Sequence, residues 1–469
     1  MVNMHSQKQL LERMEKMKKT LKNLIVLSLV CVMALSFASC GDKETSTDGV
    51  EKITMWSDNT HSKAVFEELV KKFNETTGKE KGIELVYEVK EGEGKDLDLA
   101  IKSGNAPDLF QKCNKDIAYD GQIVAINDIE GGTEFLKKYN PKYLKTYTYD
   151  GKTYSVPFSS SARGLIINND MFKAAGIVDE NGNAKAPETW DEFVAVAKKL
   201  TNPEKNQYGI VFPMKWGTWV ASDITSPAFS SIGYESYNPA TGKYDFTSYK
   251  PMLEVIMQIK KDGSYLPGAE GLDNDPARAR FAEGNIGMKF GFSWDVGVFN
   301  DQFPAKMDWS VVPYPVFDKD NKYSQIISVN GGMAINKKSK KDINKIFEVY
   351  KWYHSPEVMT ELYGNCMELP VSSDFLLDDT LKVEKKGWAD FCDLIDISTT
   401  REQAMPYEAS NLESFPNAVI NKIWYESESI DEVLKYYTDA YNKGVDKYFE
   451  LHPDEKREDY IIPDYDVKR

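Results

Sequence analysis

The sequence lacks the short motifs that mark most enzymes and nucleotide-binding proteins. It contains no GxxxxGK(S/T) phosphate loop, no GxGxxG fingerprint, no GxSxG or SxxK nucleophile motif and no HExxH zinc motif. It has only 4 histidines, and none of them is spaced as a pair of metal ligands. We therefore expect no metal, no cofactor and no catalytic activity in this chain.

Clustered positive charge is also missing. The chain has 58 Lys and Arg against 73 Asp and Glu, a net charge of −15. Binding to nucleic acid depends on cations that neutralise phosphates, so we expect no nucleic-acid partner. Hydrophobic residues make up 41% and charged residues 28%, which excludes disorder of the whole chain. The length of 469 residues suggests about two to four domains or one large two-lobed body.

Cysteine is scarce as well, with 5 residues and no CxxC spacing. Cys31 lies in an apolar leader and Cys40 directly follows it. The remaining Cys113, Cys366 and Cys392 are odd in number, so a disulfide framework is not expected. A single pair among them is left open, and the favoured interpretation is that they are small apolar residues of the interior.

One apolar run stands out at the N-terminus. Residues 24–38 (LIVLSLVCVMALSFA) form a 15-residue apolar segment behind a basic stretch that ends at Lys22. A membrane-spanning helix needs about 20 residues, so the pattern favours a cleaved signal peptide. The segment FASCG (37–41) resembles a bacterial lipobox, in which Cys40 is acylated, with palmitate for example, although Phe37 stands where Leu is usual.

These features predict a signal peptide over 1–39, followed by a lipidated Cys40 and a flexible tether over 40–50. The protein is then expected at the cell membrane, lipid-anchored and facing the extracellular side or the periplasm. Ordinary secretion, with Cys40 incidental, is the alternative.

The body alternates short apolar strands with amphipathic helices. Strands are predicted at 53–56, 83–89 and 108–110, with helices at 65–73 and 97–102 between them. This βαβαβ order predicts a parallel sheet covered by helices. The later elements are a hairpin over 147–154 with an Asp-Gly turn, a capping box over 189–192 that opens a helix to 200, strands at 164–168, 208–212, 286–290, 309–313 and 332–335, and helices at 170–175, 342–353, from 355 onward and 430–448.

Several blocks are distinctive in their order and spacing. They are SGNAPDLF (103–110), YDGKTYSVPF (149–158), GLIINNDMFKAAGI (164–177), PETWDEFVAVAKKL (187–200), RFAEGNIGMKFGFSW (280–294), GGMAINKKSKK (331–341) and LPVSSD (369–374). Together they resemble the extracellular solute-binding proteins of bacterial sugar importers, the maltose-binding-protein-like group.

The resemblance implies an α/β fold class, a two-lobed periplasmic-binding-protein-like (type II) clamshell with hinge crossings. It suggests crossings near 156–160, 318–323 and 369–371. Lobe 1 would comprise 50–157 plus 323–369, and lobe 2 would comprise 158–322 plus 370–469.

The resemblance also implies a function. The protein would be the substrate-binding lipoprotein of an ABC-type carbohydrate importer, capturing a mono- or oligosaccharide between its lobes and delivering it to the transmembrane subunits of a permease. It would act as a monomer. The alternatives are a binding protein for another solute such as a polyamine, a lipoprotein that docks polysaccharide without an importer, and a secreted glycoside hydrolase with paired carboxylates.

Candidate ligand contacts follow from where the strands end. Ligands of open α/β sheets bind beyond the carboxyl ends of the strands. A sugar has apolar C–H faces that stack on aromatic rings and hydroxyls that need polar partners. The candidates at strand ends, in one aromatic loop and at the crossings are Trp56, Asp58, Asn59, Phe110, Gln111, Ser160, Arg163, Trp216, Trp219, Trp294, Asp295 and Asn330.

Some of these candidates have a structural alternative. Trp216 and Trp219 are three residues apart and can share a core-facing helix face. Asp58 and Asp295 can cap helices. Arg163 can be the partner of an ion pair within the protein.

Overall fold

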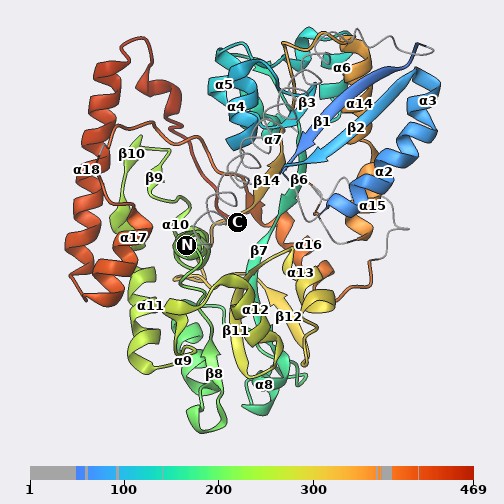
Figure 1. Cartoon of the computed structure of the whole chain (residues 1–469). Coiled ribbons are helices and arrows are strands. Elements are labelled where there is room, and N and C mark those ends of the chain that lie inside the picture. Colours follow the sequence, from blue (N-terminus) through green and yellow to red (C-terminus); the bar gives the residue numbers. More distant parts are fainter. Residues whose placement is uncertain are drawn as a thin grey trace, which may run out of the picture.

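The chain folds into two lobes that are joined by crossing strands (Figure 1). The computed structural model describes residues 49–58, 62–90, 95–139, 141–365, 368–369, 371, 383–409 and 411–469. The predicted signal peptide, Cys40, Asn59 and Cys366 therefore lie outside the described residues. Within the described ranges, no helix has both the length and the apolar character that a membrane crossing requires.

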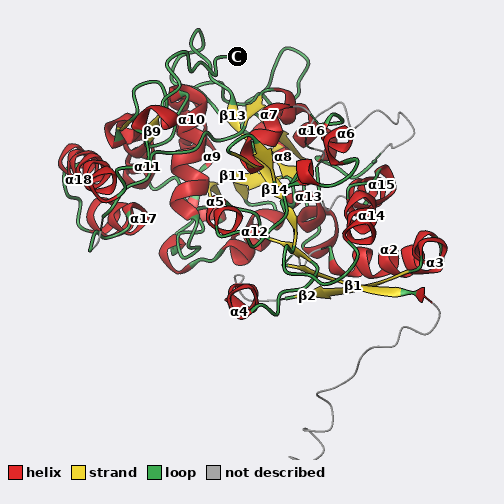
Figure 2. Ribbon diagram, turned by 90° about the horizontal axis from the view of Figure 1, so that it is seen from above, coloured by secondary structure: helices red, strands yellow, loops and turns green. Residues whose placement is uncertain are grey.

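The first lobe is built on a four-stranded sheet in the order β15-β3-β1-β2. β1 (Glu51–Ser57) is parallel to both β2 (Ile83–Val89) and β3 (Leu109–Gln111), which confirms the predicted parallel βαβαβ unit. β15 (Met333–Ile335) returns from late in the chain and pairs antiparallel with β3. Helices α2 (Lys63–Glu75), α4 (Lys95–Ser103), α14 (Ile343–Tyr353) and α15 (Pro356–Gly364) belong to this lobe (Figure 2).

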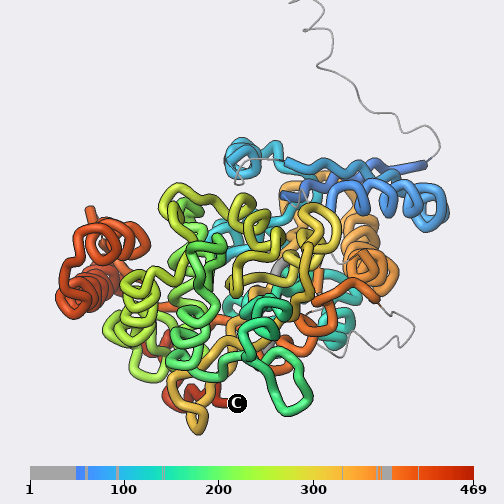
Figure 3. Tube along the Cα trace, turned by 90° about the horizontal axis from the view of Figure 1, so that it is seen from below, coloured from blue at the N-terminus to red at the C-terminus, as the bar shows by residue number. Residues whose placement is uncertain are grey.

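The second lobe has a mixed sheet in the order β12-β7-β11-β8. β11 (Ile286–Phe292) is buried along its whole length and lies parallel to β8 (Tyr208–Ile210). β7 (Arg163–Asn168) is antiparallel to β11 and to β12 (Trp309–Val312). The helices of this lobe include α8 (Asn169–Ala174), α9 (Trp190–Leu200), α11 (Lys250–Asp262) and the long C-terminal α18 (Ile430–Leu451), which lies at the far end of the molecule from β1 (Figure 3).

Local sequence signals account for the turns and caps that set these elements. The hairpin β4 (Thr148–Tyr149) and β5 (Lys152–Thr153) turns through Asp150 at φ 49° and Gly151 at φ 72°, the left-handed pair that an Asp-Gly turn supplies. Thr189 caps α9 by accepting from the backbone N–H of Glu192 at 3.2 Å. Both features confirm the sequence-based predictions.

The two lobes are joined by strands that pair with each other. β6 (Pro157–Ser161) runs antiparallel to β14 (Ser328–Gly331), and the backbone N–H of Ser160 donates to the carbonyl of Leu369 at 2.9 Å. β14 lies beyond the segment 318–323 that the resemblance suggested for the second crossing. Within that segment, the Tyr323 N–H bonds the carbonyl of Ser230, beside the second-lobe helix α10 (Ser226–Ile232).

Contacts outside the crossing strands also link the lobes. Lys115 opens helix α5 (Lys115–Tyr119) of the first lobe, and its Nζ donates to the Tyr460 hydroxyl at 3.3 Å. The Tyr460 ring belongs to the hydrophobic core of the second lobe. Cys113 is a free thiol, and burial raises its pKa to about 12, which makes it unreactive.

His354 is a buried imidazole at the end of α14. Its ring packs among those of Phe135, Phe158, Tyr350 and Tyr353. Neither ring nitrogen has a hydrogen-bond partner among the described residues, and burial lowers the pKa of His354 to about 3. The folded protein therefore keeps this side chain neutral at pH values where an unfolded chain would protonate it.

Replacing His354 by Phe should raise stability in acid more than at neutral pH. Between the unfolded pKa, about 6.5, and the lower folded one, only the unfolded chain binds the proton, so stability is lost as the pH falls. At pH 5, the neutral His354 should lower the free energy of unfolding by about 2 kcal/mol. Urea unfolding of wild type, His354→Phe and the control His452→Phe at pH 5 and 7.5 measures it. Equal pH dependence in all three would contradict the assignment.

Candidate functional site

Three aromatic side chains gather at the carboxyl end of β11. The rings of Phe292 and Trp294 stack with centroids 4.3 Å apart and planes 7° apart. Trp216 meets Phe292 edge-on at 5.9 Å. Trp294 is 38% exposed, and Trp216 is half-buried. We call these three residues the aromatic cluster; it offers the kind of apolar surface on which a sugar face stacks.

A buried ion network fixes the loop that carries the aromatic cluster. The carboxylate of Asp295 is fully buried and accepts from Arg278 Nε at 2.7 Å and from the backbone N–H of Phe292 at 3.1 Å. Lys289 Nζ lies 3.7 Å from the other side of the same carboxylate. Both oxygens of the Asp295 carboxylate have partners inside the lobe, so neither is left for a ligand. These contacts hold the backbone next to Trp294 in place.

One further acid lies close to this network. Asp223 is 1% exposed and lies in a π-helical turn (Ala221–Thr225), and its Oδ2 has no hydrogen-bond partner among the described residues. Burial raises the pKa of Asp223 to about 7, whereas burial lowers the pKa of Lys289. The interior next to the Asp295 network therefore contains a carboxyl group, that of Asp223, whose pKa lies near neutral pH.

The first lobe contributes a pocket of about 180 Å³ at the ends of β1, β2 and β3. The Ser57 hydroxyl donates to Gln111 Oε1 at 2.6 Å. Lys90 Nζ lies 4.3 Å from the centre of the Trp56 ring. Partial burial raises the pKa of Asp58, an acid at the pocket rim. The lining residues are Trp56, Ser57, Asp58, Lys90, Leu97, Gln111 and Lys112.

The strand registers place this first-lobe pocket and the aromatic cluster on either side of the crossing. Gln111 at the pocket pairs with Met333, two residues beyond the end of β14. Phe292 pairs with Arg163, two residues beyond the end of β6. We call the first-lobe pocket and the aromatic cluster with Arg163 the two half-sites. Each half-site lies where a crossing strand enters its lobe, as expected for a ligand site between two lobes.

The predicted contacts divide into those at a half-site and those that are interior. Trp56, Asp58 and Gln111 line the first-lobe pocket, and Trp216, Trp294 and Arg163 surround Phe292. The interior group is surrounded by packing or backbone pairing. They are Phe110 at 0% exposure, Trp219 at 1% against Trp424, Asp295 at 0% and Ser160 at 1%.

Two of the predicted contact residues are described only in part or lie outside the described residues. The backbone of Asn330 pairs with Ser159 in the crossing. Asn59 lies outside the described residues.

Sequence reasoning missed two cations of the first-lobe pocket. Lys90 directly follows β2, so the rule about carboxyl ends of strands would have found it. Lys112 directly follows β3 and pairs with Asp98. Arg401 and Ser226, which surround Arg163, carry no sequence signal, because only the tertiary fold brings residues so far apart together.

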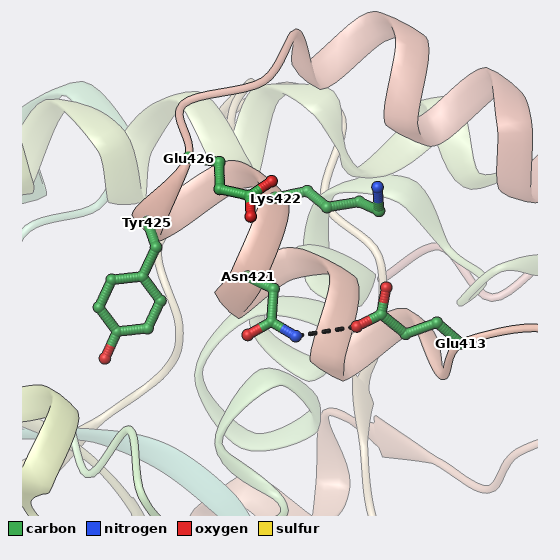
Figure 4. A pocket seen from close by; sticks show the side chains of 5 residues that line it. All are labelled: Glu413, Asn421, Lys422, Tyr425 and Glu426. Carbon is green, nitrogen blue, oxygen red and sulfur yellow. Dashed lines mark hydrogen bonds between the residues drawn. The ribbon is translucent and has the colours of Figure 1, made fainter.

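A second hollow lies on the outer surface of the second lobe, next to helix α17 (Phe415–Ala418) (Figure 4). Asn421 donates to Glu413 at 2.8 Å, and Tyr425 stands 57% exposed beside them. This hollow contains none of the predicted contacts. Across the described ranges, no group of three or more His, Cys, Asp or Glu side chains gathers in a way that would hold a metal ion.

Comparison with known proteins agrees with this geometry. The family model described as bacterial extracellular solute-binding protein matches residues 57–360. The maltotriose-binding protein of Pyrococcus abyssi is 25% identical over 310 residues, which is 64% of this chain and 62% of that protein. The sn-glycerol-3-phosphate-binding periplasmic protein of Brucella abortus is 26% identical over 320 residues, 65% of this chain and 71% of that protein.

A solved structure shows the same fold. The sugar-binding protein MalE of Xanthomonas citri superposes with a TM-score of 0.67 at 16% identity, covering 87% of this chain and all of that one (100%). The match to the Pyrococcus relative spans less than two thirds of that protein's length.

Replacing Asp295 by Asn should destabilise the second lobe strongly. The substitution leaves Arg278 and Lys289 buried without their shared carboxylate, which costs about 3–5 kcal/mol. Asp275, the other carboxylate on Arg278, is 58% exposed, so Asp275→Asn should cost less than about 1 kcal/mol. Denaturant unfolding of both variants measures the difference. An equal loss of unfolding free energy in the two variants would show that Asp295 is not the structural counter-ion of Arg278 and Lys289.

Proposed function

Because the chain belongs to the family of bacterial extracellular solute-binding proteins, we propose that it captures a mono- or oligosaccharide between its lobes and delivers it to the permease of an ABC-type importer. The observation that carries the proposal is the pair of half-sites that flank the crossing strands. Each has an aromatic face next to polar side chains, Trp56 beside Gln111 in one lobe and the stacked pair Phe292 and Trp294 in the other, where Arg163 lies over the Phe292 ring. Such pairing suits a ring with apolar faces and a polar rim.

The connection between the lobes supports capture by closure. Two paired strands and the contact at Leu369 form a narrow connection, and short crossings of this kind allow hinge bending. A ligand that touches both half-sites has more contacts when the lobes close. Its higher affinity for the closed form then drives closure, and the closed form is what the permease would bind.

The N-terminus would hold the protein at the membrane. The lipobox-like segment 37–41 and the polar tether after it support lipidation at Cys40, with the body facing the extracellular side or the periplasm. We propose that the protein acts there as a monomer.

The alternative ligands and activities fit the half-sites less well. A polyamine would meet Arg163, which repels a cationic ligand, whereas Lys90 and Lys112 are paired with Glu88 and Asp98. Glycoside hydrolysis needs two carboxylates across the scissile bond. In the described half-sites, Asp58 has exposed surface, whereas Asp295 is enclosed by its own ion pairs.

Replacing Trp294 by Ala should weaken glycan binding at least about fivefold, because the stacking surface is lost, about 1 kcal/mol or more. Thermal shift with maltotriose, raffinose and other short glycans first identifies a binder, and calorimetry then gives the Kd of the variant. Tyr425→Ala, which removes a more exposed aromatic ring from the outer hollow, is the control and should leave the Kd unchanged. Unchanged affinity in a folded Trp294→Ala protein would remove the aromatic cluster from the site.

A further inference from the structure

The second-lobe half-site contains a buried cation without a counter-ion. Arg163 is only 9% exposed. Its Nη1 donates to the hydroxyl of Ser226, its Nη2 donates to Ser328 Oγ at 2.9 Å, and its Nε has no hydrogen-bond partner among the described residues. In the part of the chain that the structure describes, no carboxylate lies within ion-pairing distance of this guanidinium.

The charged neighbours of Arg163 do not offset its charge. Arg401 shares a partner with Arg163, because its Nη2 donates to Ser226 Oγ at 3.5 Å. Glu235 forms two hydrogen bonds to Arg401, at 2.8 and 3.1 Å, so that acid is already neutralised. Burial and then the positive charge of Arg401 lower the pKa of Arg163 to about 10. Arg163 is therefore a buried cation whose charge no neighbouring carboxylate among the described residues offsets.

A second arginine in the same lobe shows how the chain treats a purely structural buried cation. Arg278 is 8% exposed, close to the value for Arg163. It has two carboxylate partners, Asp295 at 2.6 Å and Asp275 at 2.8 Å. A buried guanidinium is costly unless it is paired. Among the described residues Arg163 has no such partner, and a ligand can supply the oxyanion.

The contacts of Arg163 connect it to the aromatic cluster and to the crossing strand β14. Its guanidinium carbon lies 5.1 Å from the centre of the Phe292 ring, the same ring on which Trp294 stacks. Ser328 belongs to β14, the crossing strand that leads to the first lobe. Across the crossing, Lys90 and Lys112 line the other half-site. Lys90 and Lys112 have carboxylate partners, Glu88 and Asp98, whereas Arg163 has none among the described residues.

We infer that the sugar held between the lobes carries an anionic group, a carboxylate or a phosphate, and that Arg163 binds this group. The inference rests on the proposed function and adds the charge class of the ligand. A planar guanidinium matches two oxygens of such a group. Ser226 and Ser328 each accept a hydrogen bond from the guanidinium, so each hydroxyl has its own hydrogen to donate to the same oxyanion.

The test uses pairs of glycans that differ only in charge. Calorimetry compares trigalacturonate with its neutral methyl ester, and trehalose 6-phosphate with trehalose. One acidic member should bind at least about tenfold tighter than its neutral partner, with affinity falling as salt rises. The first pair tests for a carboxylate ligand and the second for a phosphate ligand. The pair in which the acidic member binds more tightly therefore identifies the anionic group.

Variants then assign the preference to Arg163. Arg163→Met should abolish the preference for the acidic member, and Arg163→Lys should keep part of it. Lys435→Met, which removes the same charge from an exposed site on α18, should change neither affinity. If Arg163→Met fails to fold, the charge preference and salt dependence of wild type still decide the question.

Two results would overturn the inference, and they are distinguishable. Neutral glycans that bind wild type as tightly as acidic ones would refute the anionic ligand and leave the sugar-binding function in place. Failure of every glycan, acidic and neutral, to bind would refute the proposed function itself.

Discussion

The position of both half-sites depends on the antiparallel pairing of the crossing strands β6 and β14. The pairing is tight at Gly331, which has φ 118° and approaches Phe158 so closely that a Cβ would lie 2.3 Å from the Phe158 Cβ. Only glycine adopts this backbone without strain. The buried hydroxyl of Ser159 donates to Glu368 at 2.5 Å, which joins the segment around 368–369 to the paired crossing strands. Any movement of one lobe on the other must therefore bend this short connection.

Most of the fold was predictable because its signals are local. Apolar spacing in α2 and the Asp-Gly turn at 150–151 each depend on neighbouring residues, and the structure confirms both. The strand order of the second lobe was not predictable, since β7 pairs antiparallel with two strands that follow it by more than a hundred residues. The site was predictable in part for the same reason. Strand ends pointed to Trp56 and Trp294, but burial of Asp295 depends on Arg278 and Lys289 from other elements.

Charge distribution separates the structural from the binding part of the second lobe. Arg278 and Lys289 both pair with the Asp295 carboxylate at the loop that carries Trp294. Arg163, which lies over the Phe292 ring, has hydroxyls in place of carboxylates. Two buried guanidinium groups in one lobe thus have opposite surroundings. The simplest physical reason is that one is satisfied by the protein and the other by the ligand.

Small-angle X-ray scattering of the purified protein, with and without the tightest-binding glycan at saturation, tests the central claim most directly. If the glycan binds between the lobes and closes them, the radius of gyration falls on binding, and the glycan is recovered unchanged after incubation. Scattering that stays the same at saturation would contradict binding between the lobes. Glycan cleaved during incubation would contradict the binding-protein account.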